Sequence, residues 1–266
     1  MKGMPLGRNV KPPQKRDPGV LYPIERKPCP VTVHGYDLWR AYEFSWLNGR
    51  GKPAAGILEI AYPVRSACIV ESKSLKLYLV GLSYERFASE ESLEPVIRED
   101  LVSILKPEWL SVRIIGASNF SEMAPQNLMR GTCLDTLDIG VEESPRNPAL
   151  LSCKPGIGEE TLTSDLLRTF CPITGQPDWA TVVIRYRGRA LDHASLLRYV
   201  CSYRGHSGFA EEVCELIYVD LVERCSPERL CVTCFYTRRG GIDISAHRCS
   251  DPVGLDGVER IRLIRQ

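Results

Sequence analysis

The sequence predicts an α+β protein built from two related units. In the first half, the hydrophobic pattern gives the order strand–strand–helix–helix–strand–strand. The second half repeats parts of the first: residues 71–79 align with 192–200 at an offset of 121, and residues 107–112 align with 227–232 at an offset of 120. Both copies of the second segment read Pro-Glu-x-Leu-x-Val after a helix, which chance similarity between amphipathic helices does not explain. We therefore expect an internal duplication.

The first unit opens with an alternating strand at Tyr36–Leu47, a turn at 48–53 and a second strand at Ile57–Tyr62. Leucine spacing then predicts two helices, and two more strands are expected at Leu110–Ile115 and Cys133–Val141. The apolar residues that mark the two helices are Leu75, Leu79 and Leu82, then Leu93, Ile97, Leu101 and Leu105.

The second unit has a strand at Val182–Tyr186, a long helix that opens at Phe209, and a strand at Leu230–Tyr236 that leads through a glycine-containing turn into the last strand. The chain before the first unit is rich in Pro, Lys and Arg, and the stretch between the units is rich in Pro, Gly and Ser. The expected division is an N-terminal arm at 1–30, a first unit at 31–141, a linker at 142–159 and a second unit at 160–266.

The composition is that of an ordinary soluble globular protein, with 44% hydrophobic and 25% charged residues. A net charge of +1 gives no general attraction to nucleic acid or to an anionic membrane. No apolar run approaches the roughly 20 residues that cross a bilayer, and the N-terminus lacks the apolar segment of a signal peptide. Eleven cysteines in such a chain are typical of reduced thiols in the cytoplasm.

Cys171 and Asp178 are the candidate catalytic residues. They flank the stretch Pro-Ile-Thr-Gly-Gln-Pro, whose two prolines and glycine predict a stiff turn rather than a helix. A thiolate at this turn can attack an electrophilic carbon while the acid manages a proton. The alternative is a structural cysteine followed by a turn aspartate, which we favour less because of the motifs that follow.

The segment Glu71-Ser-Lys-Ser74 lies where a strand gives way to a helix. Ser72 or Ser74 is a candidate N-cap, the free amides there favour an anionic group, and Lys73 adds a positive charge. Glu71 suits the paired N–H groups of a guanine-like edge. On its own, the segment is as well explained by a capped helix with a solvated charge run.

Two further motifs are candidates for binding. Glu211 opens the last long helix, where an acid is either a ligand carboxylate or a favourable first-turn residue. Arg238 and Arg239 precede two glycines, and such a turn suits a phosphate because the backbone approaches closely and guanidinium is bidentate. Each is also explained without a ligand, as a helix start and a hairpin turn.

The sequence predicts no metal site. Cys231 and Cys234 form the only Cys-x-x-Cys motif, but residues three apart on a strand face opposite sides of a sheet. The chain has neither a Rossmann nor a Walker A glycine motif. The four histidines, which are too scattered to suggest a cluster, are His34, His193, His206 and His247.

In combination, these motifs resemble the QueF family of NADPH-dependent 7-cyano-7-deazaguanine reductases, in its bimodular, two-repeat form. The resemblance covers nearly the whole chain after the first thirty residues. It rests on Glu71-Ser-Lys-Ser-Leu-Lys-Leu-Tyr78, on the Cys171 to Asp178 loop with Trp179, on Leu196-Leu-Arg-Tyr199, on Tyr236-Thr-Arg-Arg-Gly-Gly241 and on the closing Arg262-Leu-Ile-Arg-Gln266.

The resemblance implies tandem tunnelling-fold (T-fold) units, each an antiparallel sheet with two helices, and a homodimer in the cytoplasm. It implies reduction of the nitrile 7-cyano-7-deazaguanine to 7-aminomethyl-7-deazaguanine in queuosine biosynthesis, a tRNA modification pathway. NADPH would be the cosubstrate, no metal would be required, and the protein would bind neither nucleic acid nor a membrane directly. Since two hydrides are needed, this is a four-electron reduction.

The family's residue roles carry over onto matching positions. Cys171 would form a covalent thioimide with the nitrile, and Asp178 would donate the proton. The matching substrate contacts are Val70, Glu71, Ser72 and Glu211, and the matching NADPH contacts are Ser72, Lys73, Arg239 and Gly240.

One position departs from the family pattern, which has a histidine before Glu211 where this chain has Ala210. We therefore expect lowered but not abolished reductase activity. Two alternatives remain open: a diverged T-fold protein that binds a deazapurine without turnover, and amidinotransferase-type chemistry on the nitrile, which would keep Cys171 but not need the two arginines.

Overall fold

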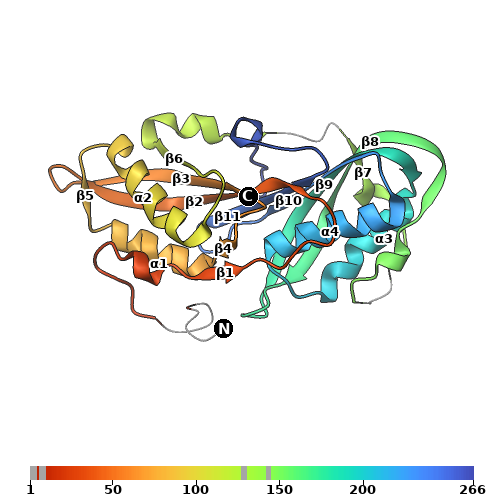
Figure 1. Cartoon of the computed structure of the whole chain (residues 1–266), viewed down its shortest axis with the longest axis horizontal. Coiled ribbons are helices and arrows are strands. Elements are labelled where there is room, and N and C mark those ends of the chain that lie inside the picture. Colours follow the sequence, from red (N-terminus) through yellow and green to blue (C-terminus); the bar gives the residue numbers. More distant parts are fainter. Residues whose placement is uncertain (1–4, 6–9, 127–130, 142–144) are drawn as a thin grey trace.

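One long, mainly antiparallel sheet joins the two halves of the chain (Figure 1). The computed structural model describes residues 5, 10–126, 131–141 and 145–266. The strand order is β6-β3-β2-β11-β10-β9-β8-β7. The units meet where β2 pairs antiparallel with β11, with Asp37 opposite Ala246. The main strands are β2 (His34–Asn48), β3 (Pro53–Pro63), β6 (Ser111–Gly116), β8 (Cys153–Phe170), β9 (Pro177–Leu191), β10 (Arg229–Tyr236) and β11 (Ile242–Cys249).

Within the described ranges of the chain, four helices pack against the sheet, and the two in the first unit are those that the leucine spacing predicts. The first unit contains α1 (Ser72–Leu82) and α2 (Glu90–Leu105), and the second contains α3 (His193–Ser202) and α4 (Ala210–Cys225). Lys106 and Ser226, which follow α2 and α4, both adopt the left-handed conformation that ends a helix. The short strands are β1 (Pro23–Glu25) paired with β4 (Cys68–Val70), β5 (Arg86–Phe87) beside β2, and β7 (Thr132–Cys133) beside β8.

The duplication is also visible in side-chain contacts. In each unit, a tyrosine on the first helix bonds an aspartate on the second, and an arginine from the segment preceding the unit pairs with that aspartate. In each unit, a serine hydroxyl near the start of the first helix also accepts a hydrogen bond from a backbone amide of the segment that precedes the unit. The two sets are Tyr78, Asp100, Arg16 and Ser74 in the first unit, and Tyr199, Asp220, Arg146 and Ser195 in the second.

Three expectations are corrected. The strand expected at Cys133–Val141 is wrong beyond Cys133, because the chain turns there: Asp135 accepts from the Ser164 hydroxyl (2.6 Å) and the Asp165 amide (2.7 Å) of β8. The expected linker at 142–159 ends earlier, since β8 begins at Cys153. In the expected arm at 1–30, β1 pairs with β4, so part of that segment belongs to the first unit.

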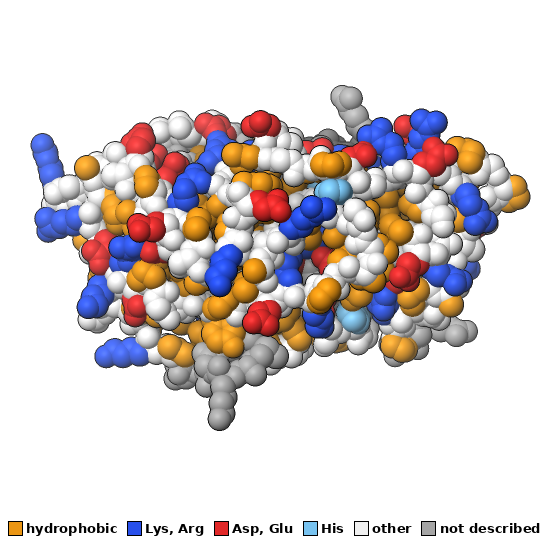
Figure 2. Space-filling model, viewed as in Figure 1, with side chains coloured by type: hydrophobic (Ala, Val, Ile, Leu, Met, Phe, Trp, Pro, Cys, Tyr) orange, Lys and Arg blue, Asp and Glu red, His pale blue; other side chains and the backbone are white. Residues whose placement is uncertain are grey.

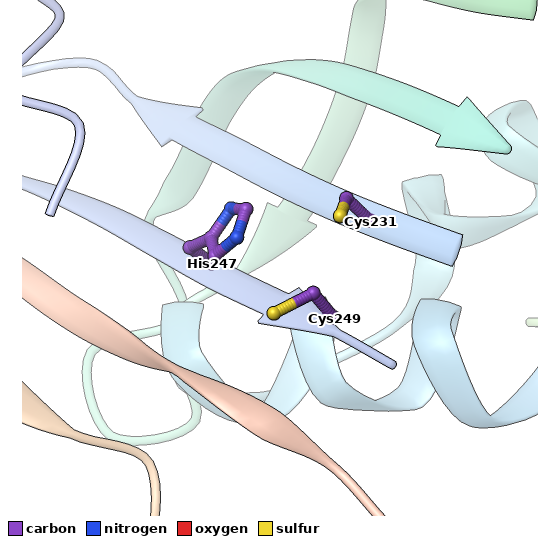
Figure 3. A group of neighbouring side chains, drawn as sticks. All are labelled: Cys231, His247 and Cys249. Atoms are coloured by element: carbon purple, nitrogen blue, oxygen red, sulfur yellow. The ribbon is translucent and has the colours of Figure 1, made fainter. Parts of the chain in front are cut away.

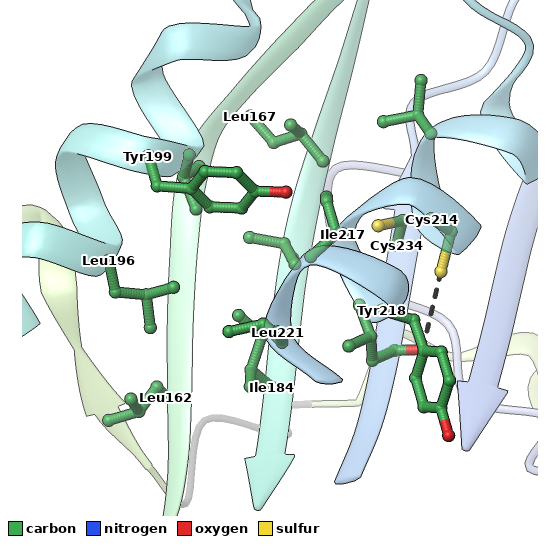
Figure 4. Close-up of a cluster of buried hydrophobic side chains, with 14 of the residues drawn as sticks. Leu162, Leu167, Ile184, Leu196, Tyr199, Cys214, Ile217, Tyr218, Leu221 and Cys234 are labelled. Atoms are coloured by element: carbon green, nitrogen blue, oxygen red, sulfur yellow. Dashed lines mark hydrogen bonds between the residues drawn. The ribbon is translucent and has the colours of Figure 1, made fainter. Parts of the chain in front are cut away.

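Each unit has its own apolar core between its helices and the sheet. Figure 4 shows the second core, where Leu167, Ile184 and Leu196 pack with Ile217 and Leu221 of α4. Charged side chains of both signs are scattered over the face seen in Figure 2, in keeping with the small net charge. In the described part of the chain, no helix has the length and apolar character to cross a membrane.

Candidate active site

A pocket of about 770 Å³, its open mouth included, lies at the seam between the two units. The first unit contributes Trp39 of β2, the end of β4 and the start of α1. The second unit contributes the loop after β8, the start of α4 and the turn after β10. The predicted site residues that line this one pocket are Val70, Glu71, Ser72, Cys171, Asp178, Glu211 and Arg239.

The predicted turn after β8 is present and holds Cys171 at the wall of the pocket. The Cys171 amide donates to the carbonyl of Gln176 (2.9 Å), and the Gly175 amide donates back to the carbonyl of Cys171 (3.0 Å). Gly175 has φ of 65°, a conformation that favours glycine. The Phe170 amide also donates to the carbonyl of His206, at 2.8 Å. This bond ties the turn to the loop that precedes α4.

The surroundings of Cys171 favour its thiolate. Burial opposes ionisation, but hydrogen bonds from the Thr174 hydroxyl, from the Thr174 and Ile173 amides and from Arg239 outweigh it, so the pKa of Cys171 is lowered. Cys171 is only 7% exposed, so little bulk solvent reaches its sulfur. Because Cys171 lines the pocket, a bound ligand can still approach it. A partly shielded thiolate is the nucleophile that covalent catalysis requires.

Asp178 lies across the turn and forms an ion pair with Arg239. Burial raises the pKa of Asp178, and the Arg239 guanidinium only partly offsets that rise. Arg239 also donates to the Gln176 side chain (2.6 Å) and the Thr174 hydroxyl (3.3 Å). One guanidinium therefore holds the turn, the acid and the thiolate in one arrangement.

Glu71, rather than Ser72 or Ser74, caps α1. Its two carboxylate oxygens accept from the amides of Lys73 (2.6 Å) and Ser74 (2.8 Å). The Ser74 hydroxyl donates instead to the carbonyl of Glu71, at 2.6 Å. The expectation that a serine caps this helix is therefore wrong: the longer glutamate side chain reaches both amides, and the serine hydroxyl faces the backbone.

Glu211 is a buried acid at the start of α4 and is 3% exposed. Among the described residues, its Oε1 has no hydrogen-bond partner. Burial, with a smaller contribution from the charge of Asp37, raises the pKa of Glu211 to about 7. A buried carboxylate oxygen without a partner is unfavourable, and a ligand N–H donor placed beside it would satisfy it.

Comparison with known proteins identifies the family. The family model "Nitrile reductase, 7-cyano-7-deazaguanine-reductase N-term" matches residues 14–113, and the model "QueF-like protein" matches residues 177–252. The chain is 42% identical to the NADPH-dependent 7-cyano-7-deazaguanine reductase of Desulfotalea psychrophila, over 99% of this chain and 98% of that protein. The chain belongs to this reductase family.

Other members of the family are similarly close. The reductase of Bordetella pertussis is 40% identical over 93% of both chains, and that of Legionella pneumophila is 39% identical over 98% of this chain and 94% of that protein. Among solved structures, the apo form of the archaeosine synthase QueF-Like aligns with a TM-score of 0.33 and 21% identity, covering 38% of this chain and 99% of that chain.

Two residues in the neighbourhood were not predicted. Trp39 lines the pocket, and its indole Nε1 has no partner among the described residues. Lys76 lines both the pocket and a neighbouring groove beside Gly240 and Gly241. Burial, then the charge of Arg239, lowers the pKa of Lys76. Its position four residues after Ser72, on the same helical face, was the available indication.

Four remaining positions are placed as follows. Gly240 lines the neighbouring groove, and a Cβ added to it would meet the Lys76 ammonium at 2.4 Å. Lys73, a predicted NADPH contact, follows Ser72 on α1 and does not line the pocket. Ala210 lines the pocket, whereas His206 packs edge-on against Tyr203 and lies outside the lining.

Proposed function

We propose that this chain is an NADPH-dependent reductase that converts 7-cyano-7-deazaguanine to 7-aminomethyl-7-deazaguanine. The observation that carries the proposal is that Cys171, Asp178 and Glu211, from three separate segments, line one pocket in a chain 42% identical to such a reductase. The placing of this reaction in queuosine biosynthesis is part of the proposal.

The carboxylates account for recognition of the base. A deazaguanine presents adjacent ring N–H and amino donors, which match a carboxylate with free acceptor capacity. Glu211 has such an oxygen. Glu71 faces the same pocket beside Val70 and Ser72, although both its oxygens also cap α1. We assign Glu211 as the principal contact and Glu71 with its neighbours as the opposite wall.

The capture step uses Cys171 and Asp178. The thiolate sulfur attacks the nitrile carbon, so a C–S bond forms while one C–N π bond breaks, and the nitrogen takes a proton from Asp178. The product is a thioimide, which has a C=N bond able to accept hydride. The raised pKa of Asp178 suits a proton donor, and the lowered pKa of Cys171 suits a nucleophile at neutral pH.

When bound, NADPH would supply two hydrides. The first would go to the thioimide carbon, with expulsion of the Cys171 thiolate to leave an imine, and the second to the imine carbon, whose nitrogen would take a second proton to give the amine. The residues beside the pocket fit an anionic cosubstrate. Lys76 and Arg239 place two positive charges at the border of pocket and groove, and Gly240 leaves the groove backbone open. Ser72 and Lys73 at the start of α1 would complete the contacts.

The proposal includes tandem T-fold units, a homodimer and a cytoplasmic location. The repeated order of two strands and two helices supports the tandem arrangement, with the same tyrosine–aspartate–arginine contact in each unit. All eleven cysteines are free thiols, as in proteins of a reducing compartment.

The test is steady-state turnover with the nitrile. We expect two NADPH molecules to be oxidised for each aminomethyl product, identified by mass spectrometry, and loss of turnover in Cys171→Ala and Asp178→Asn. A guanidine- or amidine-containing product formed without NADPH oxidation would favour amidine transfer. Tight binding of the nitrile with no product would favour the non-catalytic alternative.

A further inference from the structure

A second cluster of chemically reactive side chains lies on the sheet away from the pocket (Figure 3). Cys231 on β10 is directly opposite Cys249 on β11, and His247 is two residues before Cys249. Side chains two apart on a strand share a face, so all three lie on one side of the sheet. Cys234, three residues after Cys231, lies on the other side in the apolar core, as expected from the sequence.

The three side chains converge. One ligand atom from each, the two sulfurs and a ring nitrogen, all lie within 4.8 Å of one another. In Figure 3, the Cys249 sulfur points back towards the His247 ring. None of the three residues lines the pocket that holds Cys171. The cluster is thus separate from the proposed active site.

The histidine ring is held in place by its neighbours. The Thr233 hydroxyl lies 2.8 Å from His247 Nδ1, and the ring of Tyr36 stacks on the imidazole at a centroid distance of 4.9 Å. A hydrogen bond to one ring nitrogen that fixes the ring is the usual accompaniment of a metal-binding histidine. Because Thr233 engages Nδ1, Nε2 remains as the nitrogen for a ligand.

A charged side chain lies next to the cluster. Arg185 stands opposite Cys231 on β9, and its charge is offset by a salt bridge to Glu259 at 3.0 Å. A cation bound by the two thiolates would therefore meet no unbalanced positive charge from this pair.

We propose that Cys231, His247 and Cys249 form a binding site for Zn²⁺. Two thiolates and an imidazole are ligands that zinc prefers, and the thiolates balance its charge. Cys249 and His247 are buried, whereas Cys231 is only partly buried. The ion would therefore enter from the side of Cys231, where a water molecule could be its fourth ligand. The Cys249 sulfur lies 3.1 Å from the carbonyl oxygen of Asp251, and metal binding releases the protons of the thiols that become ligands. The ion cross-links β10 and β11, whose connecting turn carries Arg239.

The test is titration of the reduced, chelator-treated full-length protein with Co²⁺, followed by Zn²⁺. We expect one equivalent of Co²⁺ to give thiolate charge-transfer and tetrahedral visible bands, and Zn²⁺ to displace them. Cys231→Ser and Cys249→Ser should each lose the charge-transfer intensity. Thr233→Val, which removes only the contact to the ring, should weaken Zn²⁺ binding about 10–100-fold.

Controls separate this site from the other cysteines. Cys68→Ser, on β4 of the first unit, and Cys171→Ala should keep the bands. Loss of the bands in Cys171→Ala, or their survival in both Cys231→Ser and Cys249→Ser, overturns the proposal. So does a Cys231–Cys249 disulfide, seen as a mass loss of two hydrogens, in a protein that binds no Co²⁺ once reduced.

One measurement needs no variant. Zinc X-ray absorption on the wild-type protein with one equivalent of Zn²⁺ should show two sulfur scatterers at about 2.3 Å and nitrogen or oxygen at about 2.0 Å. A first shell without sulfur contradicts the site even if the serine variants fail to fold.

Discussion

Replacement of Glu211 by glutamine should stabilise the free protein at alkaline pH while impairing its activity. The carboxylate is buried, its Oε1 has no partner among the described residues, and its pKa is raised from 4.5 to about 7. A rise of this size corresponds to at most about 3 kcal/mol of differential free energy. A side chain that lowers the stability of the folded protein in this way is typical of a residue retained for binding rather than for folding.

The direction with pH follows from proton binding. Between about pH 4.5 and 7 the folded protein holds a proton on Glu211 that the unfolded chain has lost, so this group's contribution to stability falls as pH rises through 7. Glutamine does not ionise, so Glu211→Gln should not lose this contribution to stability as the pH rises. In urea unfolding, the variant should match the wild type at pH 5 and exceed it by up to about 3 kcal/mol at pH 8.

Glu212→Gln is the matched control, because Glu212 is the next residue on α4 and its side chain is 35% exposed in a pair with Lys27. It should change stability little at either pH. A Glu211→Gln variant that is no more stable than the wild type at pH 8, or that differs from it equally at both pH values, would contradict this prediction. The variant should also raise KM for the nitrile, since it loses the acceptor for the base.

Three further predictions concern the turn, the pocket wall and the repeated contact. Arg239→Ala removes one of the groups that lower the pKa of Cys171, so the midpoint of iodoacetamide alkylation should move to higher pH; an unmoved midpoint contradicts this. Ala210→His introduces the histidine that the family resemblance leads us to expect there, and it should raise the rate of NADPH oxidation with the nitrile; no gain over an already fully active natural chain would refute this prediction. Asp220→Asn leaves Arg146 without its buried partner and should cost about 3 kcal/mol in urea unfolding, whereas a loss below about 1 kcal/mol would show that the pair is dispensable.

The sequence predicted the parts of the fold that follow regular periodicity. Leucine and isoleucine at helical spacing placed α1 and α2, and alternation placed β2, β3 and β10. The failures lie where a side chain overrides the local pattern. The strand expected at Cys133–Val141 is broken because Asp135 bonds two groups of β8, a contact that sequence separation conceals.

The candidate site was predicted as separate motifs, and only the fold places them together. Cys171 and Asp178 could be predicted as a pair because the prolines and glycine between them restrict the conformation of the turn. The Arg239–Asp178 ion pair could not be predicted from the sequence, because it joins two loops that lie far apart in the chain. Likewise, nothing in the sequence indicated that His247 lies beside Cys231 and Cys249, because the register of β10 and β11 brings these residues together.

The most direct test of the account is the intact mass of the protein incubated with 7-cyano-7-deazaguanine in the absence of NADPH. We expect a mass increase equal to that of the nitrile, located on Cys171. The increase should be absent from Cys171→Ala, and the bound group should be released as the amine when NADPH is added. An unmodified protein, or an adduct on another cysteine, would contradict the assignment of Cys171 as the nucleophile.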